Sequence, residues 1–183
     1  MERKSIARAR KKSAFLVIDM LNDFVLKGSP LEVPDTRKIL PLLKQKLVRA
    51  RKKGIPIIYL CDAHDKNDRE FERMNWPPHG VKGSRGAEVV KELSPLPGDT
   101  IVNKKSYSGF YRTALNRVLK RLSVEEVILT GCVTNICILY IAYEAVVRGY
   151  DVTVLKDCVA GLDRYDHNFA LRQMEKVLGV EVV

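Results

Sequence analysis

The chain has 183 residues, of which 46% are hydrophobic and 30% are charged, so it can bury the core of one globular domain. No apolar run approaches the ~20 residues of a membrane-spanning helix, and the run at Ser13–Met20 is too short for a signal peptide, so we expect a cytoplasmic protein without a membrane partner. The net charge of +10 predicts only weak phosphate affinity, because Lys and Arg are spread over the predicted helices. We therefore do not expect a nucleic-acid partner.

Basic residues are concentrated at the start of the chain. Residues 1–12 are predicted to form a solvated basic arm, and residues 13–183 a single domain. The four cysteines are too irregularly spaced for a disulfide framework or a zinc ribbon. Three of them, Cys61, Cys132 and Cys158, are interpreted as small buried hydrophobes within apolar runs.

Short apolar runs alternate with amphipathic segments along the chain. The runs predict strands at Ala14–Asp19, Ile55–Leu60, Thr100–Asn103, Val127–Leu129, Asp151–Leu155 and Val180–Val183. The segments between them predict helices at Thr36–Lys53, Ala87–Leu93, Thr113–Leu122, Ile136–Ala145 and Asp166–Leu178. This alternation is typical of an α/β fold: a doubly wound, mostly parallel sheet of about six strands, with helices on both faces in a Rossmann-like three-layer arrangement.

The segment that follows the fourth predicted strand combines a tight turn with a long apolar run. Gly131 permits the turn, and Thr134 or Asn135 can cap the helix that follows. The nearly continuous apolar residues of Ile136–Ala145 predict a helix that is buried on most sides. Cys137 falls in the first turn of this helix, where unpaired N–H groups and the helix dipole favour a thiolate.

Polar residues stand at the predicted carboxyl ends of strands or just beyond them: Asp19, Asp62, Lys104 and Cys137. Because parallel strands end at the same edge of a sheet, these side chains are candidates for a shared site. A lysine lowers the pKa of a neighbouring thiol, and a carboxyl group accepts and returns its proton, so the set fits a cysteine nucleophile. Taken singly, each residue also fits a structural role: a turn-capping acid, a solvated lysine or a core cysteine.

Four sequence blocks resemble the isochorismatase-like cysteine hydrolases and, within that family, nicotinamidase. Val17–Phe24 is similar to the family's first-strand motif, Lys104–Phe110 to its lysine block, and Gly131–Cys137 to its nucleophile turn. Asp62–His64 together with Trp76–His79 resembles the nicotinamidase metal loop. The order and spacing of the blocks fit over nearly the whole chain, so the combination is more specific than any one block.

The resemblance implies a role for each matching residue. Cys137 would be the nucleophile, Asp19 the general base and acid, and Lys104 the cation that holds both. The backbone N–H groups of Val133 and Cys137 would form the oxyanion hole. A non-proline cis peptide between Cys132 and Val133 would precede the first of these donors.

The long polar loop at 65–85 contributes to a metal site that the resemblance implies. Asp62, His64 and His79 would bind a divalent ion, Zn²⁺ or Fe²⁺, which suits two imidazoles and a carboxylate. For a further ligand we favour Glu72 over Asp68, because Glu72 precedes His79 at the spacing of the branch that this sequence resembles. The alternative is that both histidines are ordinary loop residues.

The resemblance implies an amidohydrolase that converts nicotinamide to nicotinate and ammonia through a thioester. Phe24 and Trp76 would sandwich the planar ring of this substrate, or else pack in the core under the loop. The alternatives are a related amidase for a small amide or carbamoyl compound such as N-carbamoylsarcosine, an isochorismatase-type hydrolase, an inactive scaffold, or a basic nucleic-acid-binding module. A nucleotide cofactor is not expected, because G-x-G-x-x-G and Walker motifs are absent. The resemblance also implies a homo-oligomer.

Overall fold

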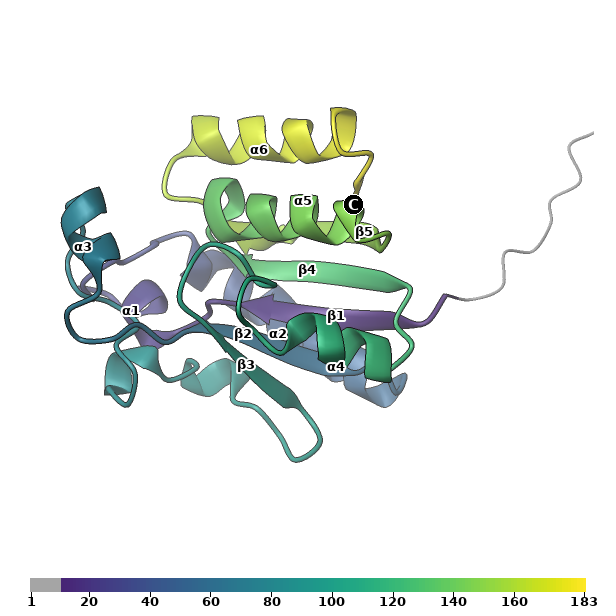
Figure 1. Cartoon of the computed structure of the whole chain (residues 1–183), viewed down its shortest axis with the longest axis horizontal. Coiled ribbons are helices and arrows are strands. Elements are labelled where there is room, and N and C mark those ends of the chain that lie inside the picture. Colours follow the sequence, from purple (N-terminus) through teal and green to yellow (C-terminus); the bar gives the residue numbers. More distant parts are fainter. Residues whose placement is uncertain (1–10) are drawn as a thin grey trace, which may run out of the picture.

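Six parallel strands form one sheet in the order β3-β2-β1-β4-β5-β6 in the computed structural model, which describes residues 11–183 (Figure 1). The strands are β1 (Ser13–Ile18), β2 (Ile57–Asp62), β3 (Thr100–Lys104), β4 (Glu126–Cys132), β5 (Asp151–Ala160) and β6 (Glu181–Val182). Every neighbouring pair is parallel. The direction of winding reverses between β1 and β4, which confirms the predicted doubly wound α/β fold and creates a switch point at their carboxyl ends.

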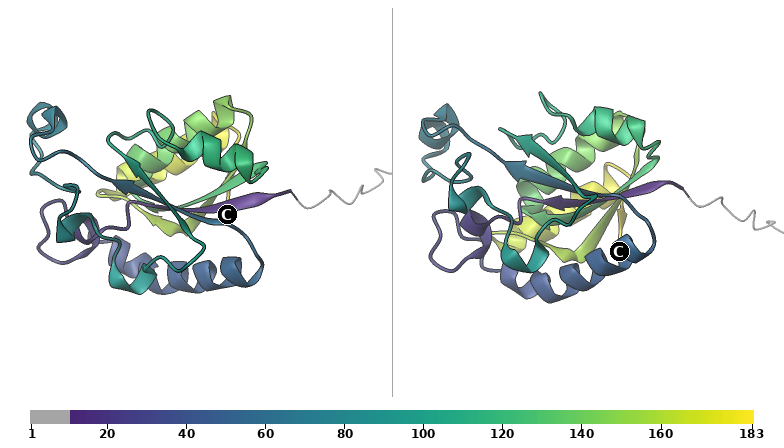
Figure 2. Two further views of the ribbon diagram at one scale, coloured as in Figure 1. Left: turned by 60° about the horizontal axis from the view of Figure 1, so that its bottom comes forward. Right: turned by 90° about the horizontal axis from the view of Figure 1, so that it is seen from below.

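Helices cover both faces of the sheet (Figure 2). The α-helices are α1 (Asn22–Val25), α2 (Thr36–Lys52), α3 (Arg69–Met74), α4 (Leu115–Arg121), α5 (Leu139–Val147) and α6 (Arg164–Lys176). Shorter helical turns are η1 (Arg85–Ala87), η2 (Lys91–Leu93) and η3 (Thr134–Ile138). Helix α2 packs on one face and α4, α5 and α6 pack on the other, whereas α1 and α3 lie beyond the carboxyl ends of the strands (Figure 1).

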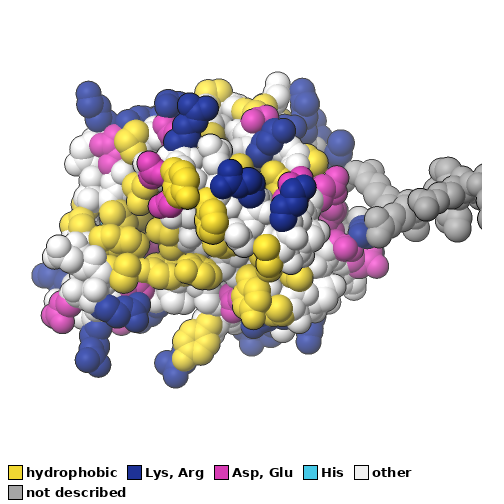
Figure 3. Space-filling model, turned by 90° about the horizontal axis from the view of Figure 1, so that it is seen from above, with side chains coloured by type: hydrophobic (Ala, Val, Ile, Leu, Met, Phe, Trp, Pro, Cys, Tyr) yellow, Lys and Arg dark blue, Asp and Glu magenta, His cyan; other side chains and the backbone are white. Residues whose placement is uncertain are grey.

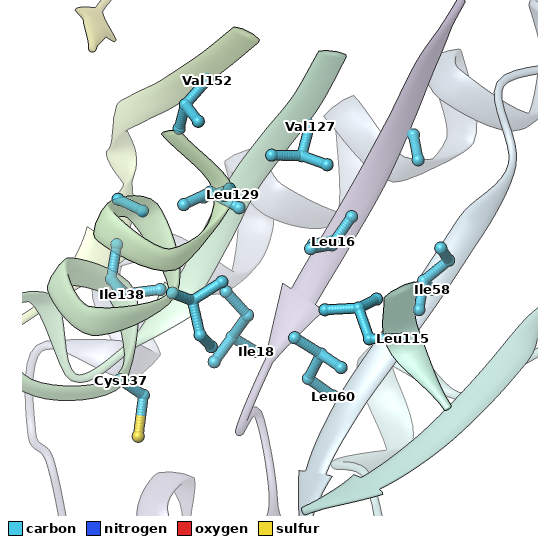
Figure 4. Packing of buried hydrophobic residues seen from close by; sticks show 14 of the residues in the cluster. Leu16, Ile18, Ile58, Leu60, Leu115, Val127, Leu129, Cys137, Ile138 and Val152 are labelled. Atoms are coloured by element: carbon cyan, nitrogen blue, oxygen red, sulfur yellow. The ribbon is translucent and has the colours of Figure 1, made fainter. Parts of the chain in front are cut away.

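Alternate residues of the central strand β1 face opposite layers. Leu16 and Ile18 belong to the cluster formed with α4 and α5, which Figure 4 shows, while Phe15 and Val17 belong to the cluster formed with α2. Because β1 is buried on both faces, its sequence is a continuous apolar run rather than an alternating one. Packing on both sides therefore fixes the end of β1, where Asp19 follows.

The segment between β2 and β3 differs from the prediction in two places. The turns η1 and η2 replace the helix predicted at 87–93, because the chain between them is extended and pairs with the loop after β1: Val90 N–H donates to the Met20 carbonyl at 2.9 Å. The polar loop at 65–85 contains α3, whose N-cap Asp68 accepts a hydrogen bond from Glu70 N–H at 3.0 Å. The site described below depends on this additional helix.

The helix after β4 is less buried than its sequence predicts. Tyr140, Tyr143 and Val147 are 47%, 52% and 59% exposed, because only one side of α5 packs against the sheet and α6. On the face that carries α5 and α6, hydrophobic side chains gather between lysines and arginines (Figure 3). The apolar run from 136 to 145 therefore includes surface positions as well as core positions.

The predicted basic arm at residues 1–12 lies outside the described residues, except for its last two members. Lys11 forms an ion pair with Asp151 at the start of β5, and Lys12 N–H donates to the Glu125 carboxylate at 3.0 Å. Within residues 11–183, none of the helices combines the length and the apolar character needed to cross a membrane.

Candidate active site

The strand ends bring together a lysine, two acids and a thiol, as the sequence predicts. Lys104 Nζ lies 2.7 Å from Asp19 Oδ2 and 2.5 Å from Asp62 Oδ1. The same Nζ lies 3.4 Å from the sulfur of Cys137. All four residues are buried, and a buried charge is tolerated only where it is paired and hydrogen-bonded. The pairing of one cation with two carboxylates meets that condition.

One oxygen of Asp19 is fixed and the other is available. Asp62 N–H donates to Asp19 Oδ1 at 2.9 Å, and Asp19 adopts a φ of 50°, which residues other than glycine rarely adopt. Its second oxygen, Oδ2, faces Lys104 at ion-pair distance but makes no hydrogen bond of good geometry within residues 11–183. This oxygen can therefore accept a proton from a neighbouring group.

The turn after β4 presents Cys137 in an unusual backbone setting. A Cβ on Gly131 would overlap the carbonyl oxygen of Ile18, so only glycine lets β4 approach β1 this closely. The predicted cis peptide immediately precedes Val133. The Val133 carbonyl accepts from Ile138 N–H at 3.2 Å, which is the spacing of a π-helix. The N–H of Cys137 is thereby left without the bond that a regular α-helix would give it.

The polar residues of η3 dock the turn onto α6 instead of capping it. The N-cap position is Val133, which has no side-chain cap, so the predicted capping role of Thr134 or Asn135 is wrong. Thr134 Oγ1 lies 2.8 Å from Nδ1 of His167, and Asn135 Nδ2 donates to Asp166 Oδ2 at 3.4 Å. These contacts fix the nucleophile turn against the first turns of α6.

Two groups of the cluster, the Asp19 carboxyl group and the Cys137 thiol, have raised pKa values. Burial, and then the charge of Asp62, raise the pKa of Asp19 to about 6, against the opposing effect of Lys104. Burial raises the pKa of the Cys137 thiol as well, and the lysine offsets this only in part. The helix terminus and Lys104 favour the thiolate, whereas burial and the two nearby carboxylates favour the thiol, and the helix-terminus argument from the sequence omits these two effects.

The lysine and the second acid stay charged. Burial alone would lower the pKa of Lys104, but Asp19 and Asp62 raise it well above its ordinary value. Burial alone would raise the pKa of Asp62, but Lys104 and His64 outweigh it and lower this pKa to about 2. A permanent ion pair thus lies beside a thiol and a carboxyl group that titrates near neutrality.

The cluster borders a small cavity. Asp19, Asp62 and Cys137 line it, and the predicted ring-binding residues Phe24 and Trp76 line it too. The structure therefore places the nucleophile candidate and both aromatic candidates around one space.

The residues of the predicted metal loop form a compact group of ligands. Asp62, His64 and His79 are buried, and they offer ligand atoms that all lie within 4.8 Å of one another. Nδ1 of His64 lies 3.1 Å from Asp68 Oδ2, and Nδ1 of His79 lies 2.8 Å from the Pro77 carbonyl oxygen. Each ring thus has Nε2 left to bind a metal, oriented by a partner on the opposite nitrogen. Two imidazoles and a carboxylate fit Zn²⁺ or Fe²⁺.

The electrostatic field at this group favours a cation. Burial alone would lower the pKa of His64, but hydrogen bonds and charges from Asp62 and Asp68 raise it to about 9. Burial lowers the pKa of His79, so that ring stays neutral. A metal ion would replace the proton of His64 in the same negative field.

Helix α3 and its N-cap carry three acids, Asp68, Glu70 and Glu72, which differ in their burial. Glu72 is exposed and is not part of the ligand group, so the structure does not bring this predicted ligand to the other three. Glu70 also lies outside the ligand group, but it is buried and lines the cavity that His79 lines, and burial raises its pKa. Asp68 contacts the His64 ring as a hydrogen-bond partner and caps α3. The sequence analysis did not identify Glu70, because it did not predict α3 and so could not tell which of its side chains face the cavity.

Tyr107 is a second residue that the sequence prediction missed. It lines the cavity, and its buried Oη has no hydrogen-bond partner among the described residues. Its ring lies 6.2 Å from Trp76 and is stacked on Tyr140 at 5.9 Å, measured between ring centroids. The available signal was its position inside the lysine block, three residues after Lys104.

The doubly wound α/β fold and this buried cluster are those of a hydrolase, and comparison with known proteins gives its family. The model of the isochorismatase domain matches residues 13–182. The chain therefore belongs to the isochorismatase family, as its sequence blocks indicate.

Three solved structures resemble the chain over nearly its whole length. An isochorismatase-like hydrolase from Alkaliphilus metalliredigens is 36% identical with a TM-score of 0.88, covering 93% of each chain. The pyrazinamidase of Pyrococcus horikoshii in complex with zinc is 32% identical with a TM-score of 0.86, covering 94% of this chain and 98% of that one. N-carbamoylsarcosine amidase from Thermoplasma acidophilum is 31% identical with a TM-score of 0.84, covering 93% and 95%. The chain is thus a hydrolase of this family, similar to enzymes named for different amide substrates.

Proposed function

We propose that this protein is a metal-assisted cysteine amidohydrolase that converts nicotinamide to nicotinate and ammonia. One observation carries the proposal: Cys137 and two residues of the metal-ligand group, Asp62 and His79, line the same cavity. A small planar amide can then meet the thiol at its carboxamide end and the ligand group at its ring end.

In the first half of the reaction, Cys137 attacks the amide carbon. Asp19 Oδ2 takes the thiol proton, which its raised pKa of about 6 permits near neutral pH. Lys104, 3.4 Å from the sulfur, stabilises the thiolate that forms. The negative oxygen of the tetrahedral intermediate is held by the N–H groups of Val133 and Cys137.

In the second half, the intermediate collapses and the thioester is hydrolysed. Asp19 returns its proton to the leaving nitrogen, so that ammonia departs and the acyl group stays on the sulfur of Cys137. A water molecule then gives a proton to Asp19 and attacks the thioester carbon. The carbon–sulfur bond breaks, and the proton on Asp19 restores the Cys137 thiol. The carboxylic acid product gives its own proton to solvent or to the released ammonia and leaves as the carboxylate.

We place the metal ion on Asp62, His64 and His79, and Glu70 replaces Glu72 as the further protein group. When bound, such an ion supplies a Lewis-acid site for a heteroaromatic ring nitrogen. Asp68 and the Pro77 carbonyl keep the two imidazoles in the tautomer that leaves Nε2 free.

The aromatic residues position the planar ring. Phe24, Trp76 and Tyr107 line the cavity and offer large, rigid surfaces at a low entropy cost. The Oη of Tyr107, which has no hydrogen-bond partner within residues 11–183, can donate to a polar atom of the substrate.

A second candidate is an amidase for a carbamoyl compound. The observation that favours it is the pair of polar groups at the cavity, Glu70 and the Tyr107 hydroxyl, which match the N–H and C=O groups of a ureido substrate. The similarity to N-carbamoylsarcosine amidase supports the same candidate.

Ammonia release from a panel of small amides tests the proposal. Nicotinamide, pyrazinamide, benzamide and N-carbamoylsarcosine are compared, each with added Zn²⁺ and with a chelator. We expect the highest kcat/KM for nicotinamide, a loss of activity with the chelator, and weak turnover of benzamide, which lacks the ring nitrogen. Preference for the carbamoyl compound would support the second candidate, and chelator-resistant turnover would remove the metal from the proposal.

A further inference from the structure

The residues at the start of α1 have no part in the proposed reaction, yet they hold the segment that carries His79. Asp23 Oδ2 accepts a hydrogen bond from Gly80 N–H at 2.9 Å, and Asn22 Nδ2 donates to the Arg85 carbonyl at 2.8 Å. We infer that Asp23 is a positioning residue for the metal ligands, because it fixes the backbone of Gly80, around which all three ligands are arranged. This inference rests on the proposed metal centre.

Gly80 is linked to each of the three ligands. It directly follows His79, and its carbonyl oxygen accepts from His64 N–H at 2.9 Å. A Cβ on Gly80 would come within 2.8 Å of the Cβ of Asp62, and its φ of 54° lies in the left-handed region. Backbone conformation and space both require glycine here. A shift of the Gly80 peptide would therefore disturb the spacing of His79, His64 and Asp62 together.

A second glycine confines the Asp23 carboxylate. A Cβ on Gly86 would overlap the carboxylate, so the turn η1 passes directly against it. The neighbouring backbone is held as well, since Asn22 N–H donates to the Glu88 carbonyl at 2.9 Å. Asp23 thus lies between the backbone segments at Gly80 and Gly86 and cannot easily exchange its hydrogen-bond partner.

The charge of Asp23 determines how strongly Gly80 is held. A hydrogen bond from a backbone N–H to a carboxylate is roughly twice as strong as one to a neutral acceptor. Removing a group that orients metal ligands typically lowers metal affinity roughly 10–100-fold. Asp23→Ala removes the acceptor, whereas Asp23→Asn keeps an oxygen without the charge. Gly86→Ala displaces the carboxylate while leaving residue 23 unchanged, so it tests the same contact from the opposite side.

Calorimetric titration of the metal-free, full-length protein with Zn²⁺ tests the inference. The variants are Asp23→Ala, Asp23→Asn and Gly86→Ala, with Asp157→Asn as the control, because Asp157 is an exposed acid on β5. The rate of alkylation of Cys137 by iodoacetamide, located by peptide mass, is measured on the same metal-free samples. This second readout reports the nucleophile side of the site, to which Asp23 makes no hydrogen bond within the described residues.

We expect Asp23→Ala and Gly86→Ala to weaken Zn²⁺ binding roughly 10–100-fold, with Asp23→Asn between them and the wild type. Alkylation of Cys137 should stay within about twofold of the wild-type rate, since second-site effects at non-contacting positions are small. Unchanged Zn²⁺ affinity in both disruptive variants would overturn the inference and leave the metal centre intact. Equal losses of Zn²⁺ binding and of normal alkylation in both variants would also overturn it, because they indicate a general structural role. A wild-type protein that takes up no Zn²⁺ would instead remove the proposed metal centre, and this inference with it.

Discussion

The ammonium group of Lys104 lies 2.5 Å from the Asp62 carboxylate, so one acid belongs to both the nucleophile cluster and the metal-ligand group. The backbone N–H of Asp62 also fixes Asp19, at 2.9 Å. The two parts of the site are therefore built on one strand end. Replacing Asp62 itself is therefore expected to affect both parts.

Removing the buried lysine should cost much stability. Lys104→Met leaves Asp19 without a buried cation and Asp62 with His64 alone, and we expect the free energy of unfolding to fall by about 3–5 kcal/mol. Lys105→Met is the matched control, because Lys105 is exposed and pairs with Asp65 on the surface, a contact worth about 1 kcal/mol or less. Urea unfolding followed by Trp76 fluorescence measures both. Equal effects of the two substitutions would contradict the role given to Lys104.

The pH dependence of Cys137 alkylation should show the pKa of its proposed proton acceptor, Asp19. Asp19 has its pKa raised to about 6, so it is protonated below that pH and cannot take the proton of Cys137. We expect the alkylation rate of Cys137 in the metal-free protein to fall as the pH drops through about 6. Cys137 in the control variant Asp19→Asn should react slowly, and its rate should show no fall of this kind near pH 6. A wild-type rate that stays constant down to the ordinary aspartate pKa of 3.8 would contradict the assignment.

Substitutions of the two glutamates of α3 should differ in their effect on the affinity for Zn²⁺. Glu70 is buried and lines the cavity, whereas Glu72 is exposed, so Glu70→Gln should weaken Zn²⁺ binding roughly 10–100-fold and Glu72→Gln should leave it unchanged. Calorimetric titration of the two metal-free variants measures this difference. Weaker binding in the Glu72 variant alone would restore the ligand that the sequence favours.

Much of the fold and the cluster could be predicted because they follow from strand patterns. Continuous apolar runs identify strands that are buried on both faces, and parallel strands bring their carboxyl ends to one edge. That rule places Asp19, Asp62 and Lys104 together without any knowledge of side-chain packing. The residues of the metal group were predicted differently, by matching Asp62–His64 and Trp76–His79 to the metal loop of the family that the sequence resembles.

Three features could not be predicted from the sequence, because they depend on which side of a helix is buried or on the burial of a side chain. Glu70 and Glu72 lie two residues apart, roughly 200° around a helix. Choosing between them therefore requires knowing that α3 follows its N-cap at Asp68 and which of its sides faces the cavity. The raised pKa of Cys137 depends on the burial of its thiol and on the charges of two neighbouring acids, which a helix-terminus argument does not contain. The exposure of Tyr140 depends on which side of α5 meets the sheet.

The central claim is that Cys137 forms a covalent bond to the acyl group of an amide substrate. The direct measurement is the mass of acid-quenched protein taken during turnover of nicotinamide, followed by peptide mapping. The account predicts the mass gain of one nicotinoyl group on the peptide that contains Cys137, and neither this adduct nor ammonia release in a folded Cys137→Ala variant. Ammonia release that persists in Cys137→Ala, or an adduct on another cysteine such as Cys132, would contradict it.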